Sequence, residues 1–103
     1  MSATEICKIF TMEQWKNFEA EGLFKGSPHD TRDGFIHMSQ MTQVEGVIAR
    51  YFQGLRPLIV ARFSTLEFGS DLVWEAASNG DIYPHIYGRP LNWKAVIGTQ
   101  EIS

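Results

Sequence analysis

The segment 34–39 places an imidazole and a hydroxyl two residues apart, at His37 and Ser39. Side chains two positions apart on a β-strand point to the same face, so both groups can converge on one ligand. An imidazole offers a donor or an acceptor, and a hydroxyl offers both. The pattern therefore predicts a ligand-binding pair. The alternative is that Ser39 caps the next helix while His37 is a hydrogen-bonded core residue.

A second candidate is Glu75, which follows Val73 and Trp74 at the end of an apolar stretch. Partial burial beside a tryptophan raises the pKa of a carboxyl group and makes it a candidate acid, base or electrostatic stabiliser. The alternative is a glutamate at a strand end that points into water.

The segment 83–90 has the sequence YPHIYGRP, in which aromatic, imidazole and guanidinium groups are combined with two prolines and a glycine. Rigid irregular segments commonly position binding groups. His85, Tyr87 and Arg89 are therefore candidate ligand-binding residues, and we expect His85 to share one pocket with His37. The alternative is a packed turn that fills gaps in the core.

A metal site is not expected. His29, His37 and His85 could in principle combine with Asp30 or Glu75. The histidine pairs lack the helical i, i+4 spacing of zinc motifs, and the chain has no CxxC motif. We therefore predict no metal among the cofactors.

Regular elements must hold these residues in place. A strand is expected at 5–10 and a helix at 12–21, because Thr11 and Gln14 match the capping-box pattern. Residues 23–33 contain many turn formers and are predicted to be a loop, from which a short strand emerges at 35–38.

The second predicted helix is capped by Ser39 or Thr42 and ends at Gly54. Its apolar positions recur at helical spacing and predict one buried face, made of Val44, Val47, Ile48, Tyr51 and Phe52. Strands are expected at 57–63, 72–75 and 93–98, the last continuing towards 102, with a helical turn at 65–67. Residues 83–88 are expected to be irregular because of Pro84.

These elements predict an α+β fold with a small mixed, twisted sheet and two main helices. The residues 1–103 contain no repeat or linker, and we interpret them as a single domain. The predicted core contains apolar residues from both helices and from the later strands: Trp15, Phe18, Val44, Ile48, Phe52, Ile59, Val60, Phe63 and Val96.

Composition narrows the function classes. The 103 residues are 44% hydrophobic and 20% charged, which excludes a disordered or low-complexity chain. No apolar run is long enough to span a membrane, and no secretory signal is recognised. The net charge of −3 makes nucleic acid an unexpected partner. The lone Cys7 favours a cytoplasmic protein and is expected to be buried and inert.

The motifs at 34–39, 74–75 and 83–88, in this order, resemble the bacterial domain-of-unknown-function family 952 over nearly the whole chain. That family is similar in fold to the ADP-ribosyltransferase group, whose members hold NAD in a cleft between two small sheets. The resemblance implies an ADP-ribosyltransferase-like fold. In that group an H-x-S motif holds nicotinamide and its ribose, and His37-Met38-Ser39 matches this motif.

The resemblance further implies that Glu75 stabilises the transition state of ribosyl transfer, with Glu101 as an alternative. His85, Tyr87 and Arg89 would line the pocket, while Tyr51 is a poorer candidate because its helical phase predicts burial. The expected function is binding of NAD or a related nucleotide, with ADP-ribosyl or related glycosyl transfer. Two alternatives stay open: a non-catalytic module for a small molecule or protein, and a homodimer face formed by exposed aromatics.

Overall fold

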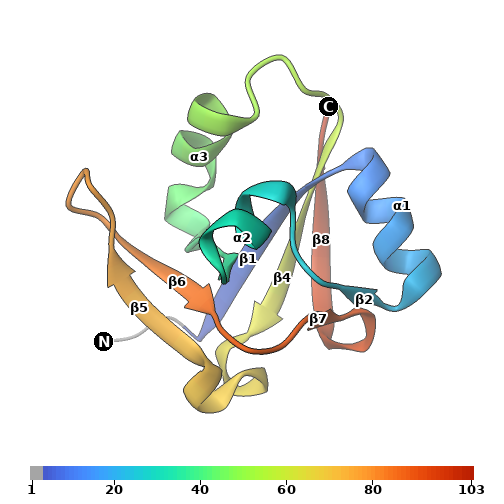
Figure 1. Ribbon diagram of the computed structural model, residues 1–103. Coiled ribbons are helices and arrows are strands. Elements are labelled where there is room, and N and C mark those ends of the chain that lie inside the picture. Colours follow the sequence, from blue (N-terminus) through green and yellow to red (C-terminus); the bar gives the residue numbers. More distant parts are fainter. Residues whose placement is uncertain (1–3) are drawn as a thin grey trace.

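A computed structural model describes residues 4–103 as three small antiparallel sheets with helices between them (Figure 1). The first sheet has the order β1 (Glu5–Thr11), β4 (Leu58–Ser64) and β8 (Val96–Ile102). The second pairs β2 (Leu23–Phe24) with β7 (Leu91–Asn92). The third has the order β3 (Ile36–His37), β6 (Ile82–Ile86) and β5 (Leu72–Ala76). The helices are α1 (Met12–Glu21), α2 (Pro28–Asp33) and α3 (Val44–Tyr51).

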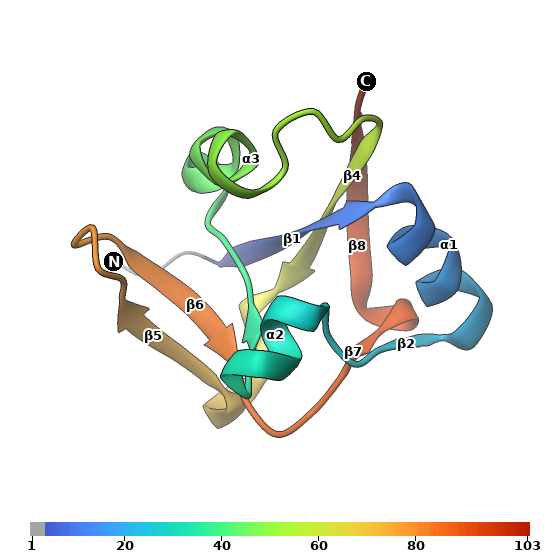
Figure 2. The same ribbon diagram turned by 45° about the horizontal axis from the view of Figure 1, so that its top comes forward.

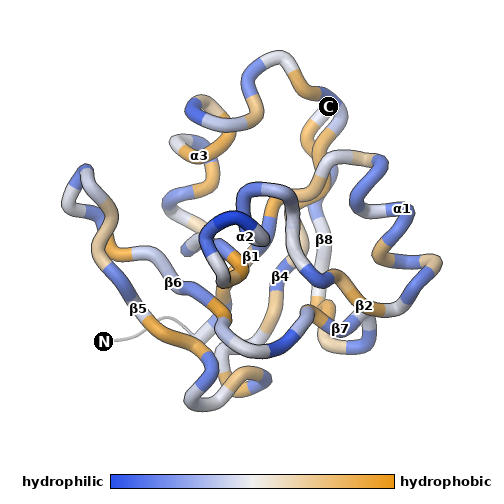
Figure 3. The backbone as a smooth tube through the Cα atoms, in the orientation of Figure 1, coloured by the Kyte–Doolittle hydropathy of each residue, from blue (hydrophilic) through white to orange (hydrophobic). Residues whose placement is uncertain are grey.

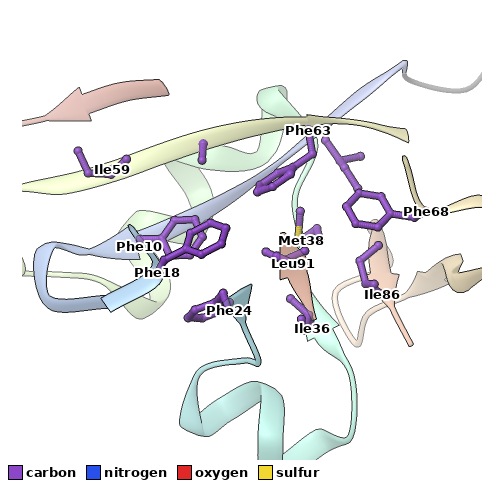
Figure 4. Close-up of a cluster of buried hydrophobic side chains, with 12 residues drawn as sticks. Phe10, Phe18, Phe24, Ile36, Met38, Ile59, Phe63, Phe68, Ile86 and Leu91 are labelled. Atoms are coloured by element: carbon purple, nitrogen blue, oxygen red, sulfur yellow. The ribbon is translucent and has the colours of Figure 1, made fainter. Parts of the chain in front are cut away.

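The first sheet is buried on both faces, which explains why its central strand β4 is a continuous apolar run. Ile59, Ala61 and Phe63 project into one core cluster, which Figure 4 shows around Phe10 and Phe18. Leu58 and Val60 project to the opposite face and pack under α3. The prediction of a central strand here is confirmed.

Helix α1 begins and ends as its sequence predicts. The Thr11 hydroxyl accepts from the Gln14 amide, and the Gln14 side chain accepts from the Thr11 amide, so the capping box is complete. Gly22 ends the helix in the left-handed conformation, with φ of 79°. Phe18 is fully buried from this helix, whereas Trp15 packs half-buried against the same cluster.

The expectation of a loop at 23–33 is wrong, because this segment contains strand β2 and helix α2. A second capping box starts α2: the Ser27 hydroxyl accepts from the Asp30 amide, and the Asp30 carboxylate accepts from the Ser27 amide. Pro28 occupies the first turn, where its missing N–H costs nothing. Turn-forming residues thus act here as helix-start residues.

The second predicted helix differs at both ends. Ser39 caps no helix, because its backbone pairs with Cys7 of β1, and a 3₁₀ turn at Met41–Gln43 leads into α3. Helix α3 ends at Tyr51, before Gly54. Tyr51 is 58% exposed, so the prediction that it faces the core is wrong. Val44 and Ile48 are buried as expected, and Phe52 is half-buried.

The expectation that 83–88 is irregular is wrong for 83–86, because residues 82–86 form β6, the central strand of its sheet, whereas 87–88 lie outside any strand. The Met38 amide donates to the Pro84 carbonyl at 2.9 Å. The reciprocal bond would need an N–H on Pro84, which proline lacks. That position lies just beyond the end of β3, so the sheet tolerates the proline where its neighbour strand has already ended.

Helix α2 lies between the β5–β6 hairpin and the β2–β7 pair in both views of the ribbon (Figures 1 and 2). It is the most hydrophilic helix, with the sequence PHDTRD (Figure 3). The backbone bridge between Ser39 and Cys7 ties the end of β3 to β1. The β1–β4–β8 sheet, the β3–β6–β5 sheet and the polar helix α2 are therefore neighbours.

The α+β class is confirmed, with two corrections. The pairings between the named strands of residues 4–103 are antiparallel, so the sheets are not mixed, and three α-helices are present instead of two main ones. Most predicted core residues are buried, while Trp15, Phe52 and Val96 are half-buried. Within residues 4–103, no helix is long and apolar enough to cross a membrane.

Candidate functional site

One face of the sheet β3–β6–β5 carries both histidines of the predicted site. His37 on β3 lies directly opposite His85 on β6. The adjacent Met38–Pro84 pair is joined by a hydrogen bond, so His37 and His85 form the non-hydrogen-bonded type of pair, in which side chains lie closest. Their ring centroids are 5.3 Å apart, which confirms the expected proximity. The neighbouring Phe35 ring stacks on His85 with 4.1 Å between centroids.

Asp30 of α2 holds His37 at two points. Its Oδ1 accepts from the His37 backbone amide at 3.0 Å and lies 2.7 Å from Nδ1 of the ring. A carboxylate only accepts hydrogen bonds, so Nδ1 must carry the hydrogen. Its Nε2 lies 3.0 Å from Oδ2 of Asp33, so both ring nitrogens of His37 face carboxylates.

Asp30 is itself buried, with 2% of its side chain exposed. Lys8 of β1 donates to Oδ2 of Asp30 at 2.9 Å and to the His37 carbonyl at 2.7 Å. Burial opposes ionisation of Asp30, but the hydrogen bond from His37 and the Lys8 ammonium outweigh it and hold the pKa of Asp30 below its usual range. Burial lowers the pKa of Lys8, and Asp30 opposes that change.

A similar pair forms at His85. Oε1 of Glu75 lies 2.7 Å from Nδ1 of His85 and accepts from the Tyr87 hydroxyl at 2.7 Å. The hydrogen bonds from Tyr87 and His85 lower the pKa of Glu75. The same bond to Glu75 raises the pKa of Tyr87. Glu75 is therefore ionised at neutral pH and orients His85 as Asp30 orients His37.

Both histidines border a pocket of about 630 Å³. Helix α2 contributes His29 and Asp33, and helix α3 contributes Arg50 and Tyr51. Tyr51 lies with its ring centroid 5.7 Å from that of His29, so the exposed face of α3 forms a pocket wall. Tyr83 of β6 also borders the pocket, and its hydroxyl raises the pKa of Arg50.

Of the remaining predicted site residues, some line this pocket and others do not. Ser39 borders the pocket, although the residue is buried. Glu75 and Tyr87 do not line the pocket. Glu75 contacts His85, and Tyr87 contacts Glu75. Arg89 borders a separate hollow of about 410 Å³ and interacts with Glu67, with 3.4 Å between Nη2 and Oε2.

Comparison with known proteins identifies the family. Residues 9–99 match the family described as "Protein of unknown function (DUF952)". The chain belongs to this family. The match extends from β1 to β8 and includes the pocket residues described above, apart from Lys8. No curated protein matches the chain.

Solved structures similar to this chain are also known. The X-ray crystal structure of protein CC0527 from Caulobacter crescentus is 37% identical, with a TM-score of 0.88, over 95% of this chain and 85% of that one. The solution NMR structure of CC0527 is also 37% identical, with a TM-score of 0.82, over 95% of this chain and 84% of that one.

Sequence reasoning missed several residues of this DUF952 site. The sequence pattern offers Asp30 only as a turn former or a possible metal ligand, and it indicates no site role for Lys8 or Asp33. One signal was available: Ser27 and Asp30 have the spacing of a capping box, which would have revealed α2. The role of Lys8 had no local signal, because its partner is 22 residues away in the sequence.

A group of possible metal-ligating atoms also lies in the pocket of this DUF952 member. His29, Asp33 and His37 each offer one ligand atom, and these atoms lie within 4.8 Å of one another. Oδ2 of Asp33 is 3.2 Å from Nε2 of His29 and 3.0 Å from Nε2 of His37. A hydrogen bond from Arg32 is the main cause that lowers the pKa of Asp33, so its carboxylate is ionised at neutral pH.

Proposed function

We propose that the pocket binds a nucleotide of the NAD class and that the protein transfers its ADP-ribose to water or to an acceptor hydroxyl. The observation that carries the proposal is the pair of neighbouring histidines, each with Nδ1 2.7 Å from a carboxylate. With Nδ1 donating to Glu75, His85 presents Nε2 as a proton acceptor, whereas Nε2 of His37 faces Asp33. The protein would thus resemble the ADP-ribosyltransferase group in chemistry as well as in its His37-Met38-Ser39 motif.

The pocket has the size and lining that this ligand class requires. Its volume of about 630 Å³ falls within the range of roughly 300–1,000 Å³ found for small-molecule sites. Tyr51 and Tyr83 supply flat surfaces for a base or a nicotinamide ring, and Arg50 supplies a guanidinium for phosphate. His37 and Ser39 would contact the nicotinamide and its ribose.

The reaction would break the bond between the ribose C1′ and the nicotinamide nitrogen. Neutral nicotinamide leaves, and positive charge develops on the ribose. The acceptor oxygen then bonds to C1′, and Nε2 of His85 takes its proton. Glu75 acts through His85 in this proposal, because its carboxylate balances the imidazolium that forms. It is therefore a positioning residue.

Binding is tested by calorimetry and thermal shift with NAD, ADP-ribose and nicotinamide, in buffer containing EDTA. NAD and ADP-ribose are expected to raise the melting temperature. His85→Gln should weaken NAD binding about tenfold, the size of one lost hydrogen bond. Lys94→Gln, an exposed change on the turn before β8, should leave NAD binding unchanged. A failure of both nucleotides to bind overturns the proposal.

Transfer is tested by nicotinamide release from NAD, with Glu75→Gln as the variant. Turnover should fall about 10²-fold or more while NAD affinity changes little, because the charge on Glu75 matters most when His85 becomes positive. The control is Glu67→Gln, an exposed glutamate whose partner is Arg89. Nucleotide binding without nicotinamide release would overturn the transfer step and support the alternative, a non-catalytic binding module.

A further inference from the structure

We infer that His29, Asp33 and His37 form a binding site for a divalent transition-metal ion, with Zn²⁺ as the best-matched ion. Two imidazoles and one carboxylate form a ligand set that zinc uses in catalytic sites, where a further position stays open. This site is separate from the proposed function, since its occupation needs no nucleotide.

The spacing of the ligand atoms supports the inference. Ligands at 2.0–2.1 Å from a tetrahedral zinc ion lie about 3.3 Å from one another. The observed separations from Oδ2 of Asp33 are 3.2 Å to Nε2 of His29 and 3.0 Å to Nε2 of His37. These two separations are therefore already close to those that a bound ion requires, and all three ligand atoms lie within 4.8 Å of one another.

Asp30 provides a second, independent observation. Metal-bound histidines usually donate their other ring N–H to a carboxylate, which fixes the tautomer and the ring orientation. Nδ1 of His37 lies 2.7 Å from Asp30, so Nε2, which is 3.0 Å from Oδ2 of Asp33, is the ring nitrogen left for a metal ion, and the ion would displace any proton held between them. Asp30 accepts hydrogen bonds from the Lys8 ammonium and from the Ser27 amide, at 2.9 Å each. These bonds fix Asp30 and thereby the ring of His37.

The remaining ligand can adjust. The ring centroids of His29 and His37 are 4.3 Å apart, about 1 Å closer than two rings on one tetrahedral ion. The side chain of His29 is 40% exposed, so its ring has room to rotate outward.

The two oxygens of the Asp33 carboxylate have different partners. Oδ2 faces the two imidazoles, while Oδ1 accepts from Nε of Arg32 at 3.2 Å. All three ligands border the pocket of about 630 Å³, so an ion would present its open positions to a ligand there. In the metal-bound protein, His37 would contact a nucleotide through the ion instead of directly.

The test is calorimetry of the tag-free full chain with Zn²⁺, in the absence of nucleotide. One ion per chain is expected with a Kd of about 1 μM or tighter, and Mg²⁺, which prefers oxygen ligands, should not compete. Co²⁺ should give the intense visible absorption of a four-coordinate ion. Weak binding at several ions per chain, or no binding, would overturn the inference.

Two variants locate the site. His29→Ala and Asp33→Ala should each weaken Zn²⁺ binding more than about 100-fold, because even an outer hydrogen-bond partner is worth 10–100-fold. The control Asp81→Ala removes an exposed carboxylate in the β5–β6 turn and should change nothing. Circular dichroism without metal shows whether each variant is folded. Unchanged Zn²⁺ affinity in both folded variants would exclude this site.

His85→Gln separates this inference from the proposed function. His85 is not part of the ligand group, so the variant should bind Zn²⁺ as the parent does while binding NAD more weakly. Zinc binding without nucleotide binding would leave the metal site standing and overturn the proposed function. Nucleotide binding in EDTA together with no Zn²⁺ binding would overturn the metal site and leave the proposed function standing.

Discussion

Lys8 and Asp30 show how strongly a single buried charge depends on its partner. Lys8 lies on the face of β1 that also carries Ile6 and Phe10, within an otherwise apolar core. Removing one member of a buried ion pair leaves an uncompensated charge, which is far more costly than never having the pair. This pair also holds His37, so stability and the site share the same residues.

Lys8→Met should therefore destabilise the protein. The free energy of unfolding is expected to fall by about 3 kcal/mol, the lower end of the usual range, because Asp30 keeps its hydrogen bonds from His37 and Ser27. Urea unfolding measures the change. Lys16→Met, an exposed lysine on α1, serves as the control and should change stability by less than about 0.5 kcal/mol. Equal effects of the two variants would contradict the account.

Tyr87→Phe tests how the hydrogen bond from Tyr87 affects the pKa of Glu75. The folded pKa of Glu75 is lowered first by Tyr87 and then by His85. Its bonds therefore contribute stability above the unfolded pKa, and this contribution is lost as the pH falls through the lowered folded pKa. The variant should raise the folded pKa of Glu75 towards its ordinary value, as measured by NMR titration of the carboxyl carbon. Tyr51→Phe should leave that pKa in place.

Among the elements, α2 determines the site most directly. Its six residues include His29, Asp30 and Asp33, and a capping box with Ser27 starts the helix. A helix this short is not stable alone, so its cap and its contacts must hold it. The contact of Asp30 with Lys8 and His37 anchors α2 to β1 and β3.

Ser27→Ala should affect both stability and the site. Losing an N-cap side chain costs about 0.5–2 kcal/mol, measured as the free energy of unfolding. Zn²⁺ affinity should fall together with stability, because α2 carries two of the proposed ligands. Thr11→Ala removes the equivalent cap of α1, and it should cost similar stability without changing Zn²⁺ affinity. If the two variants bind zinc equally, α2 is not held by its cap.

At the scale of the whole molecule, Cys7 reports on opening of the fold. It lies fully buried in β1, and burial raises the pKa of its thiol to about 12. The reactive thiolate is therefore nearly absent at neutral pH. Its side chain packs against Val44 and Ile48 of α3, and its thiol lies 3.3 Å from the Ser39 carbonyl, so reaching the sulfur requires α3 to move away from β1.

A thiol reagent such as a disulfide dye should therefore not label the native protein on the timescale of minutes at pH 8. Labelling should become rapid in the urea range where the whole fold unfolds, because the contacts of α3 with Cys7 belong to the buried core. The rate is measured by absorbance, with free cysteine as the control. Fast labelling without urea would show that α3 moves away from β1 in the native state.

Several features of this protein follow from its sequence alone. The capping box of α1, the central apolar strand β4 and the α+β class follow from local patterns that tertiary contacts did not override. The motif around His37 was recognisable because strand alternation is a local rule. The family resemblance is also visible in the sequence, because the motifs that carry it are short and contiguous.

Only the tertiary structure decided how these motifs combine. The sequence predicted that His37 and His85 share one pocket, but only the register between β3 and β6 places them directly opposite each other. Pro84 lies in a central strand because its neighbour strand ends first, and Tyr51 is exposed because the pocket lies beside α3. Lys8 finds Asp30 across the molecule for the same reason: long-range contacts are chosen by the packing of the whole chain, which local residue types do not specify.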